Sequence, residues 1–397
     1  MKIKLIVSIV LVLMLSACHV GRFFIYNFSD IRDYKKFPSR PLAASKTPFH
    51  FVDLNLQTAK VPTVNSQQQP IDFEKHLEKN ATVAFLVIRH DTVLYEWYRP
   101  HYDSSAIVPS FSMAKSFVSA LVGIAIGEGK IKSVNEPITN YLDFKHKDEM
   151  SKVTIQHLLD MRSGIKNIEN YYNPFGDVAK HYYGRHLKRY VKNLRLRCEP
   201  GTEWEYLSVN TQLLGLIVEK ATGKHLTDYL QEKLWTPLGM EFDAGWSIDS
   251  KKEGTEKAFC CINARARDFA KFGRLYLHKG NWNGTQLVPQ DWTEQTAYNY
   301  SSINNFLYSG QWWHNRIYMN VADTIKLKEP FVVFPAPNKN MKAVACIAAK
   351  DFYADGHLGQ FIYVLPQHDI VIVRLGKRPG SEYWPGLMRK VAYMNKL

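Results

Sequence analysis

Ser110-Phe-Ser-Met-Ala-Lys-Ser-Phe-Val-Ser-Ala-Leu-Val-Gly123 joins a polar start to a long apolar continuation. After Lys115 the chain is apolar on every face of a helix until Gly127-Glu-Gly129, which predicts a helix buried inside a large domain. Ser112 and Lys115 are three residues apart, so they share one helical face and the lysine stem reaches the hydroxyl. Because a half-buried lysine can lose its proton near neutral pH, the pair predicts a serine nucleophile with its base.

The same spacing occurs a second time, in Ser163-Gly-Ile-Lys166, but in a different context. There a glycine follows the serine directly and polar residues come next, which is typical of a turn. Ser112 instead precedes the predicted buried helix, where unpaired backbone N–H groups favour a developing oxyanion. The alternative for Ser112 is a purely structural role as the N-cap of that helix.

The N-terminal residues are typical of an export signal. Lys2 and Lys4 precede an apolar run that ends in small residues, which predicts a signal peptide at residues 1–17, too short to span a bilayer comfortably. Leu15-Ser-Ala-Cys18 resembles the lipobox of bacterial lipoproteins, in which the cysteine is lipidated and becomes the new N-terminus. We therefore expect an exported bacterial lipoprotein of the cell envelope, anchored through Cys18 to the periplasmic face of a membrane or to the cell surface. The alternative is an ordinary cleaved signal.

Two regions follow the signal. Prolines and a glutamine run predict an extended, lipidated arm or linker at residues 18–70, ahead of one domain at 71–397. Within that domain, residues from about 112 to 295 are mainly helical, whereas β-rich segments flank them at Thr82–Ile88, Thr92–Tyr98, Ala343–Ala349, Gln360–Leu365 and Ile370–Leu375. This order predicts an α+β fold, with one antiparallel sheet built from both chain ends and a helical lobe inserted into it.

The formal net charge is +14, and the most basic segment has helical spacing. Arg185, Lys188, Arg189 and Lys192 fall on one side of a predicted helix whose other side is apolar. A solvated basic face is one interpretation, and attraction to an anionic membrane or cell-wall polymer is the other. No segment resembles a nucleic-acid-binding module, so we expect no nucleic-acid partner.

The remaining cysteines show no metal-binding pattern. Cys198, Cys260, Cys261 and Cys346 lack the paired spacing of a zinc site, and no Walker, dinucleotide or His-Glu-x-x-His pattern occurs. We therefore expect neither a metal nor a cofactor. Export permits disulfides, but a bond between the adjacent Cys260 and Cys261 would need strain, so we expect mostly buried free thiols.

Two further segments complete a pattern with Ser112-x-x-Lys115. Tyr206-Leu-Ser208 lies between a Pro-Gly turn and a helix, and Gly356-His-Leu-Gly-Gln360 opens a strand. In this order the three segments resemble the class C β-lactamase-like serine hydrolases, a family that includes esterases, D-alanyl-peptidases and 6-aminohexanoate-dimer hydrolases. The resemblance extends from about Ile71 to the C-terminus and implies a β-lactamase/transpeptidase-like fold.

The resemblance also implies a role for each residue. Ser112 would be the nucleophile, with Lys115 and Tyr206 sharing the proton transfer. Ser208 would orient the lysine and the substrate, His357 would contact the substrate or the tyrosine, and Gly359 would also belong to the substrate-orienting set. The backbone N–H groups of Ser112 and Gln360 would hold the oxyanion.

Two departures from the β-lactamase pattern bear on the substrate. Ser208 stands where β-lactamases place an asparagine, and His357 replaces the lysine that would pair with a β-lactam carboxylate. Both favour a small ester or amide substrate, cleaved through an acyl-enzyme. The alternatives are a penicillin-binding receptor, a D-alanyl peptidase or β-lactamase acting on cell-wall peptides or β-lactams, and a non-catalytic envelope binding protein. The sequence names neither the physiological substrate nor the oligomeric state.

Overall fold

The computed structural model describes residues 19–54, 57–298, 308–320, 332–334 and 344–396. The chain divides into two compact units. The helical unit comprises the described residues up to Ala43, Val108–Glu232 and Asp243–Asn263. The sheet unit comprises Ala44–Ile107, Lys233–Phe242 and Ala264–Leu397.

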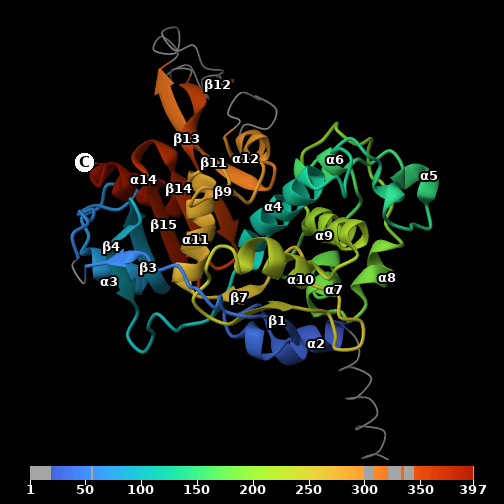
Figure 1. The fold of residues 1–397 in the computed structure, drawn as a ribbon, viewed down its shortest axis with the longest axis horizontal. Helices are drawn as coiled ribbons and strands as arrows, with labels where there is room; N and C mark the ends of the chain where they lie inside the picture. The colour runs from blue at the N-terminus through green and yellow to red at the C-terminus, as the bar shows by residue number, and fades with distance from the viewer. Residues whose placement is uncertain (1–18, 55–56, 299–307, 321–331, 335–343, 397) are drawn as a thin grey trace, which may run out of the picture. The chain divides into compact units, whose positions relative to one another are not determined.

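The sheet unit is built on a nine-stranded sheet with the order β10-β11-β13-β14-β15-β3-β4-β2, in which β12 also pairs with β13 (Figure 1). Its strands are β2 (Val52–Asp53), β3 (Thr82–Arg89), β4 (Thr92–Tyr98), β10 (Tyr308–Ser309), β11 (Trp312–Asn320), β12 (Val332–Phe334), β13 (Val344–Gly356), β14 (Gln360–Leu365) and β15 (Ile370–Gly376). The strands pair antiparallel except for β2, which runs parallel to β4. Because β15 pairs directly with β3, the sheet joins both ends of the chain, as the sequence predicted.

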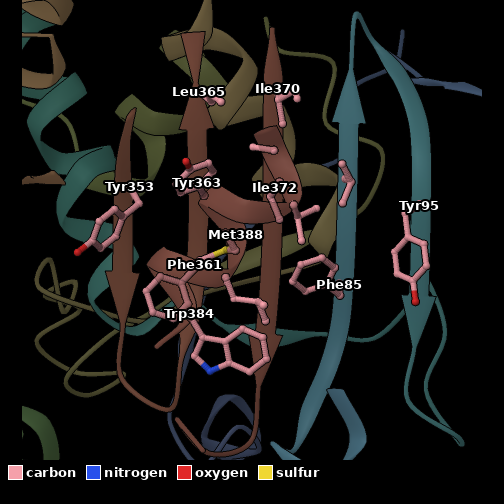
Figure 2. Close-up of a cluster of buried hydrophobic side chains, with 14 of the residues drawn as sticks. Phe85, Tyr95, Tyr353, Phe361, Tyr363, Leu365, Ile370, Ile372, Trp384 and Met388 are labelled. Carbon is pink, nitrogen blue, oxygen red and sulfur yellow. The ribbon is translucent and has the colours of Figure 1, made fainter. Parts of the chain in front are cut away.

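Helices cover both faces of this sheet. Figure 2 shows Phe85 of β3 and Ile372 of β15 meeting Trp384 and Met388 of α14 (Trp384–Met394), and α3 (Phe73–Lys79) packs into the same core. The side chains that alternate with these point to the opposite face, where Val371 and Ile362 leave no room for a side chain at Gly273 of α11 (Ala266–Leu277). Alternation of side chains along each strand therefore gives the sheet two buried faces.

The remaining elements of the sheet unit are short: the strands β8 (Asn281–Trp282) and β9 (Thr285–Gln286), the helix α12 (Gln290–Ala297) and the 3₁₀ turn η6 (Pro366–His368). Since α11 and α12 belong to the sheet unit, the helical unit ends earlier along the chain than the helical lobe expected at about residues 112–295. Helix α11 packs its apolar face against β14, β15 and β3, so it belongs to the sheet unit and the helical unit ends before it.

The helical unit contains a four-stranded sheet and most of the helices. Its strands, in the order β1-β6-β7-β5, are β1 (Ser39–Leu42), β6 (Ala244–Ser247), β7 (Ile262–Ala264) and β5 (Val108–Pro109). Its helices are α2 (His19–Tyr26), α4 (Ala114–Gly127), α5 (Lys147–Met150), α6 (Ile155–Leu159), α7 (Asp177–Tyr183), α8 (Leu187–Val191), α9 (Ser208–Thr222) and α10 (Leu226–Leu230). Helix α4 is buried from Ala114 to Ala125 and packs against α9, which confirms the buried helix expected after Lys115.

The segment expected as an extended arm has more structure than its prolines indicate. Residues 19–43 supply α2, the 3₁₀ turn η1 (Asp33–Lys35) and β1, which pairs with β6. Phe23, Phe37 and Leu42 bury their side chains in the helical unit, and this burial favours an ordered chain over a free linker. The predicted signal and Cys18 lie outside the described residues. In the part of the chain that is described, no helix combines the length and the apolar character needed to cross a bilayer.

The expectation of free thiols is wrong for the adjacent cysteines. Cys260 and Cys261 form a disulfide, are both buried, and lie in the segment that precedes β7. Cys261 adopts a left-handed backbone with φ of 74°, a conformation that the sequence analysis did not anticipate for this pair. Cys198 is a half-buried free thiol, and the Cys346 side chain lies outside the described residues.

Candidate active site

A short 3₁₀ turn, η2 (Phe111–Met113), holds Ser112 immediately before α4 begins. Ser110 fixes the start of this turn: its N–H donates to the Ile262 carbonyl at 2.7 Å, and its Oγ accepts from the Ile262 N–H at 3.0 Å. Phe111 has φ of 44°, which is unusual for a bulky residue. Strained backbone of this kind is common beside reactive groups, and here it directly precedes the half-buried Ser112.

Lys115 lies one helical turn further on and its side chain is almost fully buried, with 1% of its surface exposed. Its Nζ contacts three oxygen atoms. Ser112 Oγ lies at 2.9 Å, Phe259 O at 3.1 Å and Ser208 Oγ at 3.2 Å. The structure thus places the lysine within hydrogen-bonding distance of the candidate nucleophile.

Tyr206 and Ser208 reach Lys115 from the start of α9. Ser208 is the first residue of that helix, and the half-buried Tyr206 precedes it by two residues. The Lys115 Nζ lies 5.0 Å from the centroid of the Tyr206 ring, which is within the range of a cation–π contact. All four predicted residues of the helical unit, Ser112, Lys115, Tyr206 and Ser208, therefore share one locality.

Glu169 also belongs to this cluster, although its position in a polar turn gave no indication of that in the sequence. Its Oε1 accepts a hydrogen bond from Ser208 Oγ at 2.5 Å, and its Oε2 accepts from the Ser208 N–H at 2.9 Å. A carboxylate in this position also complements the N-terminal end of α9. Tyr171 donates to Glu169 Oε1 at 2.8 Å.

The hydrogen-bond directions around Lys115 follow from these contacts. Because the Ser208 hydroxyl donates its proton to the Glu169 carboxylate, Ser208 Oγ is left to accept from Lys115. The Phe259 carbonyl is an acceptor only. A neutral Lys115 amine has two N–H groups and one lone pair. With its two N–H groups donated to Ser208 Oγ and the Phe259 carbonyl, the lone pair would be available to Ser112. The 2.9 Å contact with Ser112 Oγ is the third of these contacts, and the role of Lys115 as the base that takes the hydroxyl proton stays a prediction.

The second Ser-x-x-Lys segment has no such arrangement. Ser163 is fully buried and donates to Asn210 Oδ1 at 2.7 Å, whereas Lys166 is exposed. Gly164 between them has φ of 66°, in agreement with the turn that its sequence predicted. Ser163 therefore serves as an internal control for Ser112.

His357, Gly359 and Gln360 lie in the sheet unit, where a tight turn connects β13 to β14. A Cβ atom at Gly359, where φ is 79°, would meet Arg374 Nη1 at 2.1 Å, so only glycine fits there. The Gln360 side chain is buried and bridges the turn to Gly376 through bonds of 2.6 and 2.9 Å. The roles of these three residues at Ser112, which lies in the helical unit, stay predictions.

Arg374 stabilises the turn between β13 and β14 through hydrogen bonds to its backbone. The buried guanidinium donates to the Leu358 and Gly359 carbonyls, and its centre lies 3.8 Å from the Trp384 ring centroid. Burial lowers the pKa of Arg374 to about 9. The half-buried His357 therefore projects from a turn whose backbone is fixed by several hydrogen bonds. Within the described ranges, no group of three or more His, Cys, Asp or Glu side chains is arranged to hold a metal ion.

Known proteins share both the sequence pattern and the fold. The family model described as Beta-lactamase matches residues 72–392. A 6-aminohexanoate-dimer hydrolase from Paenarthrobacter ureafaciens is 30% identical over 263 residues, which cover 61% of this chain and 66% of that protein.

Solved structures agree with this match at the level of the fold. A candidate 6-aminohexanoate-dimer hydrolase from Bacillus anthracis superposes with a TM-score of 0.68 at 21% identity, covering 93% of this chain and 91% of that one. A penicillin-binding protein from Bacillus halodurans gives a TM-score of 0.59 at 13% identity, covering 81% of this chain and 100% of that one. The α+β, β-lactamase/transpeptidase-like fold expected from the sequence is confirmed. The chain therefore belongs to the Beta-lactamase family of serine hydrolases.

Proposed function

We propose that this protein hydrolyses an ester or amide bond of a small molecule through an acyl-enzyme on Ser112. The observation that carries the proposal is the 2.9 Å contact between Ser112 Oγ and the buried Lys115 Nζ, which also contacts Ser208 Oγ and the Phe259 carbonyl. Ser112 Oγ would attack the carbonyl carbon while Lys115 takes its proton. The bond to the alcohol or amine then breaks, the leaving group takes a proton, and water releases the acid from Ser112.

Tyr206 would complete the proton pathway. A phenol with its ordinary pKa near 10 is a poor base at neutral pH, but the adjacent Lys115 nitrogen can exchange a proton with it. The 5.0 Å approach of Nζ to the Tyr206 ring supports this pairing. We assign Tyr206 to proton delivery to the leaving group, and the Ser112 N–H to the oxyanion.

Glu169 would act as a positioning residue, and the Glu169→Gln variant tests this. A glutamine amide can donate to Ser208 Oγ, which frees the Ser208 hydroxyl to compete for the Lys115 lone pair. We expect kcat/KM for p-nitrophenyl acetate to fall about ten- to a hundredfold, the equivalent of one misdirected hydrogen bond.

A double-mutant cycle separates this role from a structural one. If Glu169 acts through the Ser208 hydroxyl, Glu169→Gln should have little further effect on kcat/KM in a Ser208→Ala background. A loss of the same size in both backgrounds would show that Glu169 acts by another route. The thermal unfolding midpoint of each variant provides the control for folding.

The substrate preference is tested by comparing an activated ester with a β-lactam. We expect a larger kcat/KM for p-nitrophenyl acetate or butyrate than for nitrocefin near neutral pH, because position 357 carries a histidine in place of the permanently charged lysine that would pair with a β-lactam carboxylate. A lost charge-assisted contact corresponds to about 1.5 to 3 kcal/mol, or roughly ten- to a hundredfold. His357→Lys should raise nitrocefin turnover. A nitrocefin value above the ester value in the unmodified protein would overturn the assignment.

One comparison and one measurement bear on the alternatives. The 30% identical relative, named as a hydrolase of the 6-aminohexanoate dimer, supports an amide of a small amino acid as a substrate class. A penicillin-binding receptor on the same fold would form a stoichiometric adduct without turnover, and a binding protein would form none. Steady release of p-nitrophenol distinguishes the proposed hydrolase from both.

We also propose that the protein is an exported lipoprotein anchored through Cys18. Leu15-Ser-Ala-Cys18 after an apolar run supports this. We expect Cys18→Ser to move the protein from the membrane fraction to the soluble fraction of cells. One lipid chain binds membranes only marginally, so stable anchoring implies a multiply acylated cysteine. A mature wild-type form that begins well beyond residue 18 would contradict the proposal.

A further inference from the structure

A cavity of about 640 Å³ in the helical unit is lined mostly by basic side chains. Its cationic residues are Arg22, Lys35, Lys36, Arg185, Lys251 and Lys252. We propose that this basic cavity binds the phosphate of an anionic phospholipid headgroup. The inference concerns a surface separate from Ser112 and does not rest on the proposed reaction.

Arg22 is a buried cation of the cavity wall whose hydrogen-bonding groups are only partly satisfied. Its side chain belongs to α2 and is almost fully buried, with 3% of its surface exposed. Neither its Nε nor its Nη1 has a hydrogen-bond partner among the described residues. The guanidinium lies near two rings, 5.3 Å from the centroid of Tyr26 and 5.7 Å from that of Phe37. A buried guanidinium with unsatisfied N–H groups is costly, and a phosphate matches its forked geometry.

The one carboxylate in the cavity wall does not neutralise this charge. Asp249 accepts backbone N–H groups, from Leu187 at 3.1 Å, Ser250 at 2.6 Å and Thr255 at 3.1 Å. Burial raises the pKa of Asp249, which further weakens it as a counter-ion. Asp249 thus serves the local backbone and leaves Arg22 without a carboxylate partner among the described residues.

Four further cations surround the opening. Lys35, Arg185, Lys251 and Lys252 are exposed, and none of them forms an ion pair with a described carboxylate. Lys36 differs, because it pairs with Asp33 at 2.7 Å. Clustered like charges repel one another, and a bound anion removes that repulsion. Arg185 is also the first residue of the basic segment singled out in the sequence, which gives that segment a specific ligand.

Exposed apolar residues on the helix that carries Arg22, and shortly after it, indicate a lipid as the source of the phosphate. Phe24 and Ile25 belong to the same helix as Arg22 and expose 68% and 57% of their surfaces, and Phe28 exposes 50%. Helix α2 begins at His19, one residue after the predicted lipidation site. Exposed aromatic and aliphatic side chains next to basic ones are typical of segments that lie at an anionic membrane surface. A soluble phosphate compound has no acyl chains for these apolar side chains to contact.

Binding of soluble lipids to the purified full chain tests the proposal. We expect dihexanoyl phosphatidylglycerol to raise the thermal unfolding midpoint at concentrations where dihexanoyl phosphatidylcholine does not. The Lys251→Gln/Lys252→Gln variant, altered only at exposed positions, should bind phosphatidylglycerol about tenfold more weakly. Arg22→Gln should lose more, and its own unfolding midpoint without lipid shows whether it folds.

A charge-matched variant provides the control. Lys130→Gln/Lys132→Gln removes two exposed lysines of the helical unit that do not line the cavity, so it should bind as the unmodified protein does. Equal weakening by both lysine pairs would show diffuse attraction and overturn the cavity as the site. Glycerol phosphate binding as tightly as phosphatidylglycerol would overturn the lipid as the source. Absence of any phosphatidylglycerol effect would overturn the proposal as a whole.

Discussion

Ser112→Ala is expected to reduce kcat/KM for p-nitrophenyl acetate at least about a thousandfold, because it removes the oxygen that would carry the acyl group. Ser112 is the half-buried middle residue of η2, and its hydroxyl contacts Lys115. Losing one such hydrogen bond costs only about 1 kcal/mol of stability, so the variant should fold. The rate of ester hydrolysis checks the loss of activity, and the thermal unfolding midpoint of the same preparation checks that the variant folds.

Ser163→Ala is the matched control, since it removes a serine from the same Ser-x-x-Lys spacing. Its hydroxyl is buried and donates to Asn210, so the variant should lose about 1 to 3 kcal/mol of stability and yet retain nearly full activity. Ser112→Ala is thus expected to lose activity but little stability, whereas Ser163→Ala is expected to lose stability but little activity. Equal losses of activity would remove the assignment of Ser112 as nucleophile.

Lys115→Ala and Tyr206→Phe are each expected to slow acylation by about 10² to 10⁴, the usual contribution of positioned proton transfer. Lys115 is fully enclosed, so Lys115→Met, which keeps the apolar volume, separates loss of the base from loss of packing. Single-turnover acylation by an activated ester measures the affected step directly.

The combined variant tests whether the two residues act together. Lys115 and Tyr206 are in contact in the structure, and groups that transfer one proton between them should show a less than additive loss. Retention of more than about a tenth of the wild-type rate by Tyr206→Phe would remove the tyrosine from the mechanism. Full additivity would assign the two residues to separate steps.

Local patterns were sufficient to predict much of this molecule. Helix α4, the strands β3, β4, β14 and β15, and the proximity of Ser112 to Lys115 all depend on spacing over a few residues. The pairing of β15 with β3 followed from the order of the elements, because strands from both chain ends need a common sheet to bury their apolar faces.

The features that the sequence did not predict depend on contacts between distant segments. Glu169 meets Ser208 across 39 residues, and as part of a polar turn it carried no local signal of that role. Phe23 of α2 and Phe37 are buried against Tyr183 and Tyr182, which are distant in the chain, so local spacing within residues 19–43 did not indicate an ordered segment. The disulfide of Cys260 and Cys261 required a left-handed backbone at Cys261 that composition does not reveal.

The most direct test of the central claim is the intact mass of the protein after treatment with a fluorophosphonate, followed by peptide mapping. The account predicts one adduct per chain, located on Ser112, and none on Ser112→Ala. Pre-incubation with an ester substrate should slow its formation. An adduct on any other residue, or full labelling of Ser112→Ala, would contradict the assignment of Ser112 as the nucleophile.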